Sequence, residues 1–230
     1  MDRKGPIMSI WLAEGDAPMD DTTDTSDTSA TTDAGGTGDA DALAAMIARA
    51  AHAHDGIPPV ERWHPDHCGS IPMTIKADGT WHYDGSPIGR TRMVRLFSTV
   101  LRREPDGSHV LVTPVERMTI EVEDAPFVAV EVAREGEGDT QALTFRTNLG
   151  DVAEAGPERP IRLVSGAAGF RPYVLVRGDL WALATRAVAH ELAGMLEETD
   201  GETVLRSRGA TFSLVTDEGT GSDEAQPVTG

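Results

Sequence analysis

Tyr83-Asp84-Gly85-Ser86 is the stretch on which the predicted fold depends, since it joins a strand to a helix and has a counterpart in Val176-Arg177-Gly178-Asp179. In both segments a glycine precedes a side chain that can cap a helix. The elements expected around them also follow one order, namely a strand, the segment, a helix and two further strands. We therefore predict two similar strand–helix–strand units packed together.

The helices are predicted from their start signals. Ser86 is a good N-cap residue, and Pro87 suits the first helical position because its missing N–H costs nothing there. The buried stripe of this helix is formed by Met93, Leu96, Phe97, Val100 and Leu101. A second helix is expected over 179–198, capped by Asp179, and an N-terminal helix over 41–53, before a Gly-Ile-Pro-Pro stop.

Strands are predicted where β-branched and aromatic runs stand between glycine- and proline-rich turns. Two pairs have the pattern of hairpins, 71–76 with 80–83 and 203–206 with 211–214. The other predicted strands are 109–113, 117–122, 127–133, 142–147, 161–165 and 171–177. Since the helices are too few to cover a parallel sheet, we predict an α+β fold with a mostly antiparallel sheet, two main helices and the N-terminal helix.

Composition divides the 230 residues into four parts. Residues 1–40 are predicted to be a disordered acidic tail, 41–125 and 126–216 two α+β units, and 217–230 a disordered C-terminal tail. From Met1 to Asp41, ten acidic residues oppose two basic ones, which places -8 of the net charge of -18 in this stretch. The remaining -10 makes the folded part acidic as well. Met8 or Met19 could be the true start, so translation of residues 1–18 is left open.

The charge and the cysteine content restrict partners and location. An acidic chain gains nothing from nucleic acid or an anionic membrane, so we expect neither as a partner. No stretch approaches the roughly 18 apolar residues of a membrane span. The single cysteine, Cys68, excludes an internal disulfide, and no cleavage site follows the apolar run 7–13, so a cytoplasmic location is predicted. Free strand edges leave a homo-oligomer possible.

Metal binding and catalysis have weak signals. His64, His67, Cys68 and His82 are zinc-type ligands, but their spacing matches no standard site, so we expect no metal and no cofactor. Residues 165–169, Ser-Gly-Ala-Ala-Gly, do not form a nucleophile elbow, and no phosphate loop with lysine is present. The helix start near Ser86, with Arg90 beside it, could hold an anion on free N–H groups.

Several motifs in chain order resemble the bacterial family catalogued as domain of unknown function 1285, over roughly residues 63–214. They are Cys68-Gly69, Asp78-Gly79-Thr80-Trp81, Gly85-Ser86-Pro87-Ile88-Gly89-Arg90, the helix stretch 94–103, and segments 113–116, 123–127, 145–151 and 172–174. The resemblance implies a two-part α+β fold with repeated motifs and a suggested signalling role without an established activity. The matched motifs carry the residues predicted for one polar cleft, which are Arg90, Arg95, Thr113, Glu116 and Asn148, with Ser86 at the helix start.

The leading hypothesis is therefore a cytoplasmic ligand-binding or signalling-interaction module without catalytic turnover, whose partner is a small anion or another protein. The alternative is an unrecognised hydrolase or transferase in which Glu116 or Asp124 acts as general base. A third hypothesis is a structural adaptor whose arginines are all engaged in surface ion pairs.

Overall fold

The computed structural model describes residues 41, 44–45, 47–48 and 57–216, all within the compact unit Ala34–Gly230. The two predicted tails lie outside the described residues. Of the predicted helix 41–53, only five residues are described, and their backbone is helical. Two short 3-10 helices, η1 (Val60–Arg62) and η2 (Gly138–Thr140), accompany the main elements.

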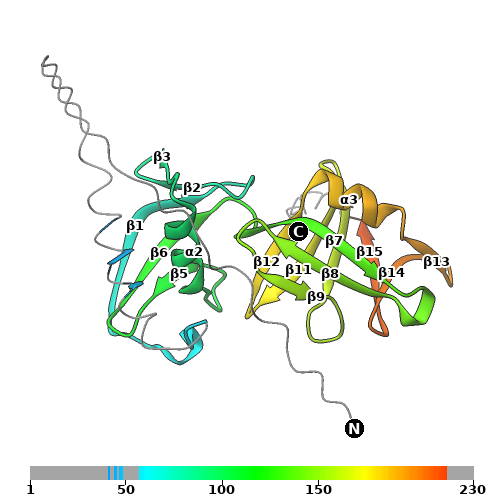
Figure 1. Cartoon of the computed structure of the whole chain (residues 1–230), viewed down its shortest axis with the longest axis horizontal. Helices are drawn as coiled ribbons and strands as arrows, with labels where there is room; N and C mark the ends of the chain where they lie inside the picture. The colour runs from blue at the N-terminus through cyan, green and yellow to red at the C-terminus, as the bar shows by residue number, and fades with distance from the viewer. Residues whose placement is uncertain (1–40, 42–43, 46, 49–56, 217–230) are drawn as a thin grey trace, which may run out of the picture. The chain divides into compact units, whose positions relative to one another are not determined.

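The first sheet has six strands in the order β3-β2-β1-β6-β5-β4 (Figure 1). Its central strands β1 and β6 run parallel, and all other neighbours are antiparallel. The helix α2 (Thr91–Thr99) links β3 to β4 and packs on one face of this sheet. The strands are β1 (His67–Ile75), β2 (Trp81–Tyr83), β3 (Ser86–Pro87), β4 (Leu101–Arg103), β5 (His109–Val112) and β6 (Glu116–Val122).

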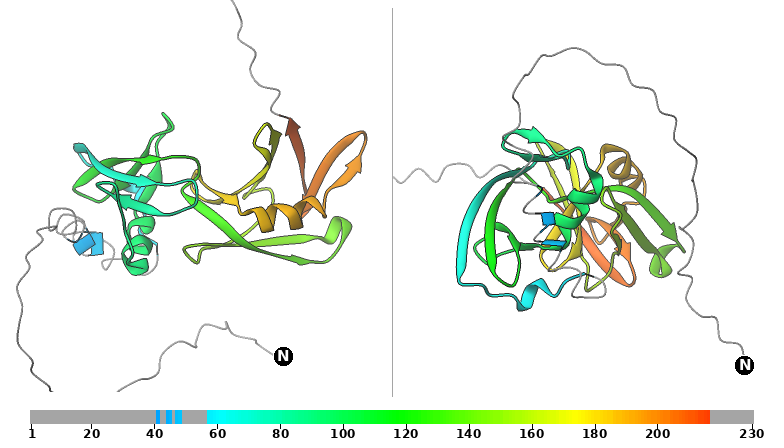
Figure 2. Two further views of the ribbon diagram at one scale, coloured as in Figure 1. Left: turned by 90° about the horizontal axis from the view of Figure 1, so that it is seen from above. Right: turned by 60° about the vertical axis from the view of Figure 1, so that its left-hand side comes forward.

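The second sheet has nine strands in the order β13-β14-β15-β10-β11-β12-β7-β8-β9. The helix α3 (Arg186–Ala193) links β12 to β13 and lies against β7, β11 and β12 (Figure 2). The strands are β7 (Phe127–Glu135), β8 (Ala142–Thr147), β9 (Val152–Glu154), β10 (Ile161–Gly166), β11 (Gly169–Arg177), β12 (Leu180–Ala184), β13 (Glu197–Thr199), β14 (Glu202–Ser207) and β15 (Ala210–Thr216).

The two sheets repeat one strand order. Written from β12, the second sheet reads β12-β11-β10-β15-β14-β13, which matches β3-β2-β1-β6-β5-β4 strand for strand. The parallel pair β10 and β15 corresponds to β1 and β6, and each helix stands between the third and fourth strand of its set. Strands β7 to β9 are an addition, attached through the parallel pairing of β7 with β12.

The predicted α+β class is wrong, because the described part is mostly β and contains only two full α-helices, of nine and eight residues. Both helices begin later than predicted. Asp84 and Gly85 have φ angles of 48° and 75°, and Tyr83 pairs with Ser86 across them. They form a two-residue hairpin turn, so Ser86 and Pro87 belong to β3 and cap no helix.

The same error occurs in the second copy, for the same reason. Gly178, with φ 51°, and Asp179 form a two-residue turn between the paired residues Arg177 and Leu180. The chain continues as strand β12, and α3 begins only at Arg186. Its cap is Thr185, whose hydroxyl oxygen accepts a hydrogen bond from the Val188 N–H at 3.3 Å.

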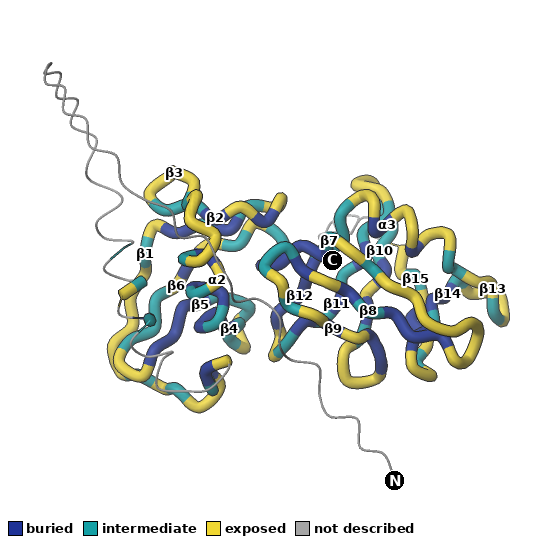
Figure 3. Tube along the Cα trace, in the orientation of Figure 1, coloured by how far each residue is buried: buried dark blue, intermediate teal, exposed yellow. Residues whose placement is uncertain are grey.

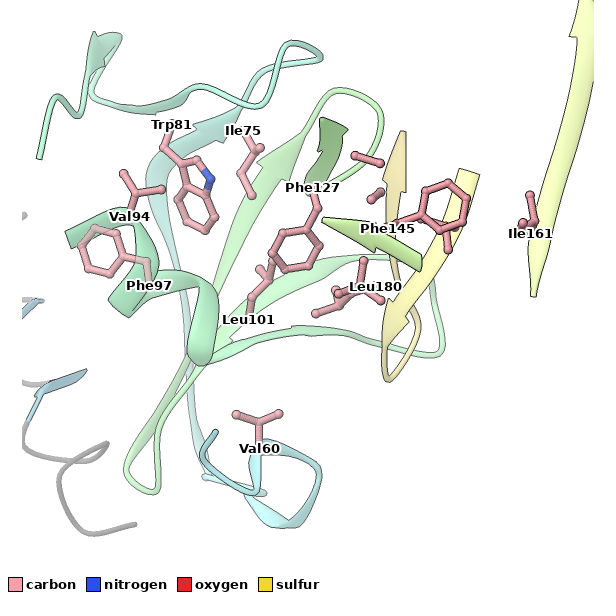
Figure 4. Packing of buried hydrophobic residues seen from close by; sticks show 14 of the residues in the cluster. Val60, Ile75, Trp81, Val94, Phe97, Leu101, Phe127, Phe145, Ile161 and Leu180 are labelled. Atoms are coloured by element: carbon pink, nitrogen blue, oxygen red, sulfur yellow. The ribbon is translucent and has the colours of Figure 1, made fainter. Parts of the chain in front are cut away.

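The predicted strands are confirmed within a few residues, as are the two hairpins, β1 with β2 and β14 with β15. The missed elements are short, namely β3, β4, β9, β12 and β13. One continuous cluster of buried hydrophobic residues spans both sheets (Figures 3 and 4). Within it α2 packs Phe97 against Trp81, with ring centroids 6.2 Å apart, and so the helix is fixed on the first sheet.

Candidate functional site

The six residues predicted to form a polar cleft lie in different places. Arg90 stands just before α2 and forms a two-point ion pair with Asp41, with Nη1–Oδ1 at 2.6 Å and Nη2–Oδ2 at 3.2 Å. Ser86 is exposed in β3. Of the five cavities described in the chain, one includes Arg95 and none includes Arg90 or Ser86.

Thr113 and Glu116 belong to the turn between β5 and β6. The Thr113 side chain is buried, and its oxygen accepts hydrogen bonds from the backbone N–H groups of Val115 and Glu116, at 3.3 and 3.1 Å. Glu116 then opens β6. The hydroxyl of Thr113 therefore closes a turn, which accounts for its place in the sequence motif without a ligand.

Asn148 joins two distant parts of the backbone. Its Oδ1 accepts from the Val128 N–H at 3.1 Å, and its Nδ2 donates to the Gly79 carbonyl at 3.3 Å. Gly79 has φ +83°, and a Cβ added there would stand 2.7 Å from a Val128 methyl. The amide of Asn148 is thus used to hold the turn after β1 against the start of β7.

The sixth residue, Arg95, lines a cavity of about 420 Å³, which we call the Arg95 cavity. Its walls come from α2, the turn between β8 and β9, the segment before β10, and the end of β11. The lining residues are Ile57, Arg95, Ser98, Thr99, Leu149, Gly150, Asp151, Val152, Arg159, Val176 and Arg177. A volume of this size is ordinary for a small-molecule site.

One arginine of the Arg95 cavity is already paired. Arg177 bonds Asp151 through Nη1 at 2.5 Å and donates from Nη2 to the Ser98 carbonyl at 2.6 Å. Its guanidinium also lies 4.9 Å from the centroid of the Phe127 ring. Burial lowers the pKa of Arg177 from its ordinary value, while the Asp151 carboxylate opposes that effect. The pair is therefore a fixed, neutral part of the wall.

Within the described part of the chain, the other two arginines, Arg95 and Arg159, have no side-chain hydrogen bond or ion pair. The charge of Arg159 also acts on the Glu154 carboxylate, which is paired with Arg208. Among the described lining residues, Asp151 is the only acidic one and is matched by Arg177, so these residues together carry a formal charge of +2. The chain as a whole has a net charge of -18, and ten of its sixteen described arginines have a carboxylate partner. Two cationic donors are therefore available in one concave place.

The turn beside these arginines is held by Thr147. Its oxygen accepts from the N–H groups of Leu149 and Asp151, at 3.3 and 3.0 Å, and its hydroxyl donates to the Asp151 carboxylate at 3.2 Å. Gly150 has φ +93°, a conformation that favours glycine, and a Cβ added there would make an ordinary contact of 3.6 Å with Arg95 Nη2. The Thr-Asn-x-Gly-Asp motif therefore shapes this wall of the cavity.

Sequence reasoning missed Arg159, Arg177 and Asp151 as members of the site. The Thr147–Asp151 motif was visible as a turn, so Asp151 could have been found from it. Arg177 was visible only as part of a presumed helix start. Nothing near Arg159 in the sequence distinguishes it from the other arginines.

Asp124, proposed as a general base, is engaged elsewhere. It forms an ion pair with Arg171 and accepts a hydrogen bond from the Tyr173 hydroxyl at 3.1 Å. Burial, followed by the nearby carboxylate, raises the pKa of Tyr173. Asp124 lines a separate cavity of about 420 Å³ with His109 and Trp181. Burial lowers the pKa of His109, with the Arg103 charge adding to the effect.

The histidines and the cysteine do not form a cluster. In the part of the chain that the structure describes, no group of three or more His, Cys, Asp or Glu side chains is placed to hold a metal ion. The Cys68 thiol is exposed, and His82 Nδ1 lies 3.2 Å from the Gly85 carbonyl oxygen.

Comparison with known families covers most of the folded part. The model of the N-terminal domain of DUF1285, a domain of unknown function, matches residues 58–125, and that of the C-terminal domain matches residues 126–214. The chain belongs to the DUF1285 family. The resemblance predicted over residues 63–214 is thereby confirmed. Arg95, Asp151, Arg159 and Arg177 all lie within the matched ranges.

Two solved structures of DUF1285 family proteins are similar to this chain. A DUF1285 family protein from Silicibacter pomeroyi DSS-3 is 46% identical, with a TM-score of 0.68, over 75% of this chain and 96% of that one. A DUF1285 family protein from Shewanella baltica OS155 is 23% identical, with a TM-score of 0.41, over 54% of this chain and 91% of that one. No curated protein matches the sequence. Among the described residues, no helix is long and apolar enough to cross a membrane.

Proposed function

We propose that this DUF1285 protein is a binding module without catalytic turnover that holds a small anionic ligand in the Arg95 cavity. One observation carries the proposal: two guanidinium groups that form no hydrogen bond or ion pair with described residues share a cavity of about 420 Å³ on an acidic chain. Arginine presents a planar fork of donors that matches carboxylate and phosphate oxygens. A ligand of opposite charge is therefore the chemistry that the cavity suits.

The wall is suited to such a ligand because it is held in place without one. The Arg177–Asp151 pair is about four-fifths buried on both sides, and Thr147 fixes the turn that carries Asp151. A pre-formed site needs little ordering when the ligand arrives, which favours affinity. The ligand would contact both α2, which carries Arg95, and the turn between β8 and β9, which carries Gly150.

The hydrolase or transferase alternative finds less support. Of the two candidate general bases, Asp124 is held by Arg171 and Tyr173, and Glu116 lines none of the five described cavities. A cytoplasmic location, a signalling role and self-association remain predictions of the sequence.

The test is a thermal-shift and calorimetric screen of the full chain with phosphate, citrate, succinate and a nucleoside monophosphate at constant ionic strength. At a ligand concentration of 100 Kd we expect about 2.7 kcal/mol of stabilisation. For a domain of this size, each kcal/mol of stabilisation raises Tm by roughly 2–4 °C.

The decisive variants are Arg95→Ala and its matched control, Arg90→Ala. Arg90 stands five residues away and pairs with Asp41 outside the Arg95 cavity. We expect Arg95→Ala to lose the ligand-induced shift and Arg90→Ala to keep it. Absence of a shift with every anion, or an equal shift in Arg95→Ala, would contradict the proposal.

A further inference from the structure

The Arg95 cavity has a second unusual feature, which is exposed apolar surface. Among the described residues, four large hydrophobic side chains are strongly exposed: Ile57 at 56%, Val115 at 66%, Val152 at 64% and Val215 at 61%. Two of the four, Ile57 and Val152, line the Arg95 cavity. Exposed apolar side chains are common one by one, but two at the rim of a cationic cavity need an explanation.

These two side chains come from distant parts of the chain. Ile57 precedes η1, and Val152 begins β9 at the edge of the second sheet. Leu149 and the buried Val176 also line the cavity. The cavity therefore has an apolar part as well as the guanidinium groups of Arg95 and Arg159.

The hydroxyl groups in the cavity do not compete with the arginines for an anion. Ser98 donates its hydroxyl hydrogen to the Arg95 carbonyl at 2.8 Å, and Thr99 donates to the Leu96 carbonyl at 2.7 Å. Their oxygens can still accept hydrogen bonds, but their hydrogens are already engaged. Oxyanion recognition therefore depends on Arg95 and Arg159.

A small inorganic anion would use only part of this site. It would reach the guanidinium groups but leave the exposed faces of Ile57 and Val152 in water. An organic anion with an apolar chain or ring would bind the arginines and cover the apolar rim together. Removal of that apolar surface from water adds to the affinity in proportion to the area buried.

We propose that the ligand is an organic carboxylate or phosphate monoester with an apolar body of several carbons. This inference rests on the proposed function and names its ligand class. The expected dependence is steep, since each methylene buried strengthens binding about fourfold, or ~0.8 kcal/mol.

The experiment measures the Kd of the full chain by calorimetry for acetate, butanoate, hexanoate and phenyl phosphate. Two further probes each lack one feature of such a ligand: inorganic phosphate has no apolar body, and hexanol has no anionic group. We expect Kd to fall roughly fourfold for each added methylene until the rim is covered. Hexanol should bind much more weakly than hexanoate, because it lacks the anionic group.

The rim is tested with threonine variants that keep β-branching; the change at Val152 is isosteric, and the change at Ile57 also shortens the side chain by one carbon. Val152→Thr and Ile57→Thr should flatten the chain-length dependence and leave acetate and phosphate binding unchanged. The matched control is Val115→Thr, since Val115 is 66% exposed but lines none of the five described cavities. It should leave the whole series unchanged.

The outcomes separate the two proposals. If acetate and hexanoate bind equally and Arg95→Ala abolishes both, the apolar inference is overturned and the anion site stands. If hexanol binds as well as hexanoate and Arg95→Ala has no effect, both proposals are overturned. A chain-length dependence that survives Val152→Thr and Ile57→Thr together also contradicts the inference.

Discussion

Replacement of Arg177 by methionine should destabilise the protein far more than removal of a surface arginine. The side chains of Arg177 and Asp151 are each 19% exposed, and Arg177 also donates to the Ser98 carbonyl. Methionine keeps the unbranched stem of the side chain but removes the guanidinium, with its charge and both hydrogen bonds. Asp151 is left with the Thr147 hydroxyl and partial access to water.

The magnitude follows from that exposure. Breaking a fully buried pair costs roughly 3–5 kcal/mol, and the partial access to water reduces this, so we expect a loss of about 2–4 kcal/mol. In urea unfolding, with a slope of about 2–3 kcal/mol per molar for a domain of this size, the midpoint should fall by about 1 M.

The matched control is Arg146→Met. Arg146 and Glu131 stand 2.6 Å apart, but their side chains are 53% and 58% exposed. Its removal should cost less than about 1 kcal/mol. The reasoning is refuted if both arginine variants lose the same stability, or if Arg177→Met and Asp151→Asn are additive in a double-mutant cycle instead of coupled.

Two further predictions concern a turn and a titrating side chain. Gly79→Ala should cost about 1–3 kcal/mol in urea unfolding, because a Cβ there would stand 2.7 Å from Val128 and 2.8 Å from Asn148 Nδ2. Gly85 also has a positive φ, but a Cβ added there would meet no atom within 4 Å, so Gly85→Ala should cost only the backbone strain of about 1 kcal/mol. Equal losses of stability in the two alanine variants would contradict the steric argument. His109 should make stability depend on pH: burial lowers its pKa below the ordinary 6.5, so the unfolded chain binds more protons between the two values. The contribution of His109 to the free energy of unfolding should therefore be complete above about pH 6.5 and be lost as the pH falls toward the pKa of the folded state. The variant His109→Gln should remove this part of the pH dependence of stability. A pH dependence that is the same in the variant would contradict the role given to His109.

The strands could be predicted because their signal is local. Apolar and polar residues alternate in 71–76 and 127–133, as expected for a pleated strand with one buried face. Turn residues, such as those at 77–79, mark where such strands end. Short strands such as β4 and β9, of three residues each, have no such pattern. Their positions depend on the neighbours they pair with.

The two helix starts show where local reasoning fails. A glycine followed by serine or aspartate suits a helix cap and a two-residue hairpin turn equally well. The choice is made by pairing across the turn, Tyr83 with Ser86 and Arg177 with Leu180. Because both copies contain the same ambiguity, both were predicted with the same error, and a β fold was taken for α+β.

By itself, the sequence determined the family, most of the strands, the repeated order of elements and the presence of Arg95 in a matched motif. The tertiary structure alone decided that Arg90 is paired, that Arg159 is available, and that Arg177 and Asp151 complete one wall. Pairing of a charge depends on residues dozens of positions away, as for Arg90 with Asp41. An acidic, arginine-rich sequence therefore shows how many cations it has, whereas only the fold decides which of them face a cavity without a partner.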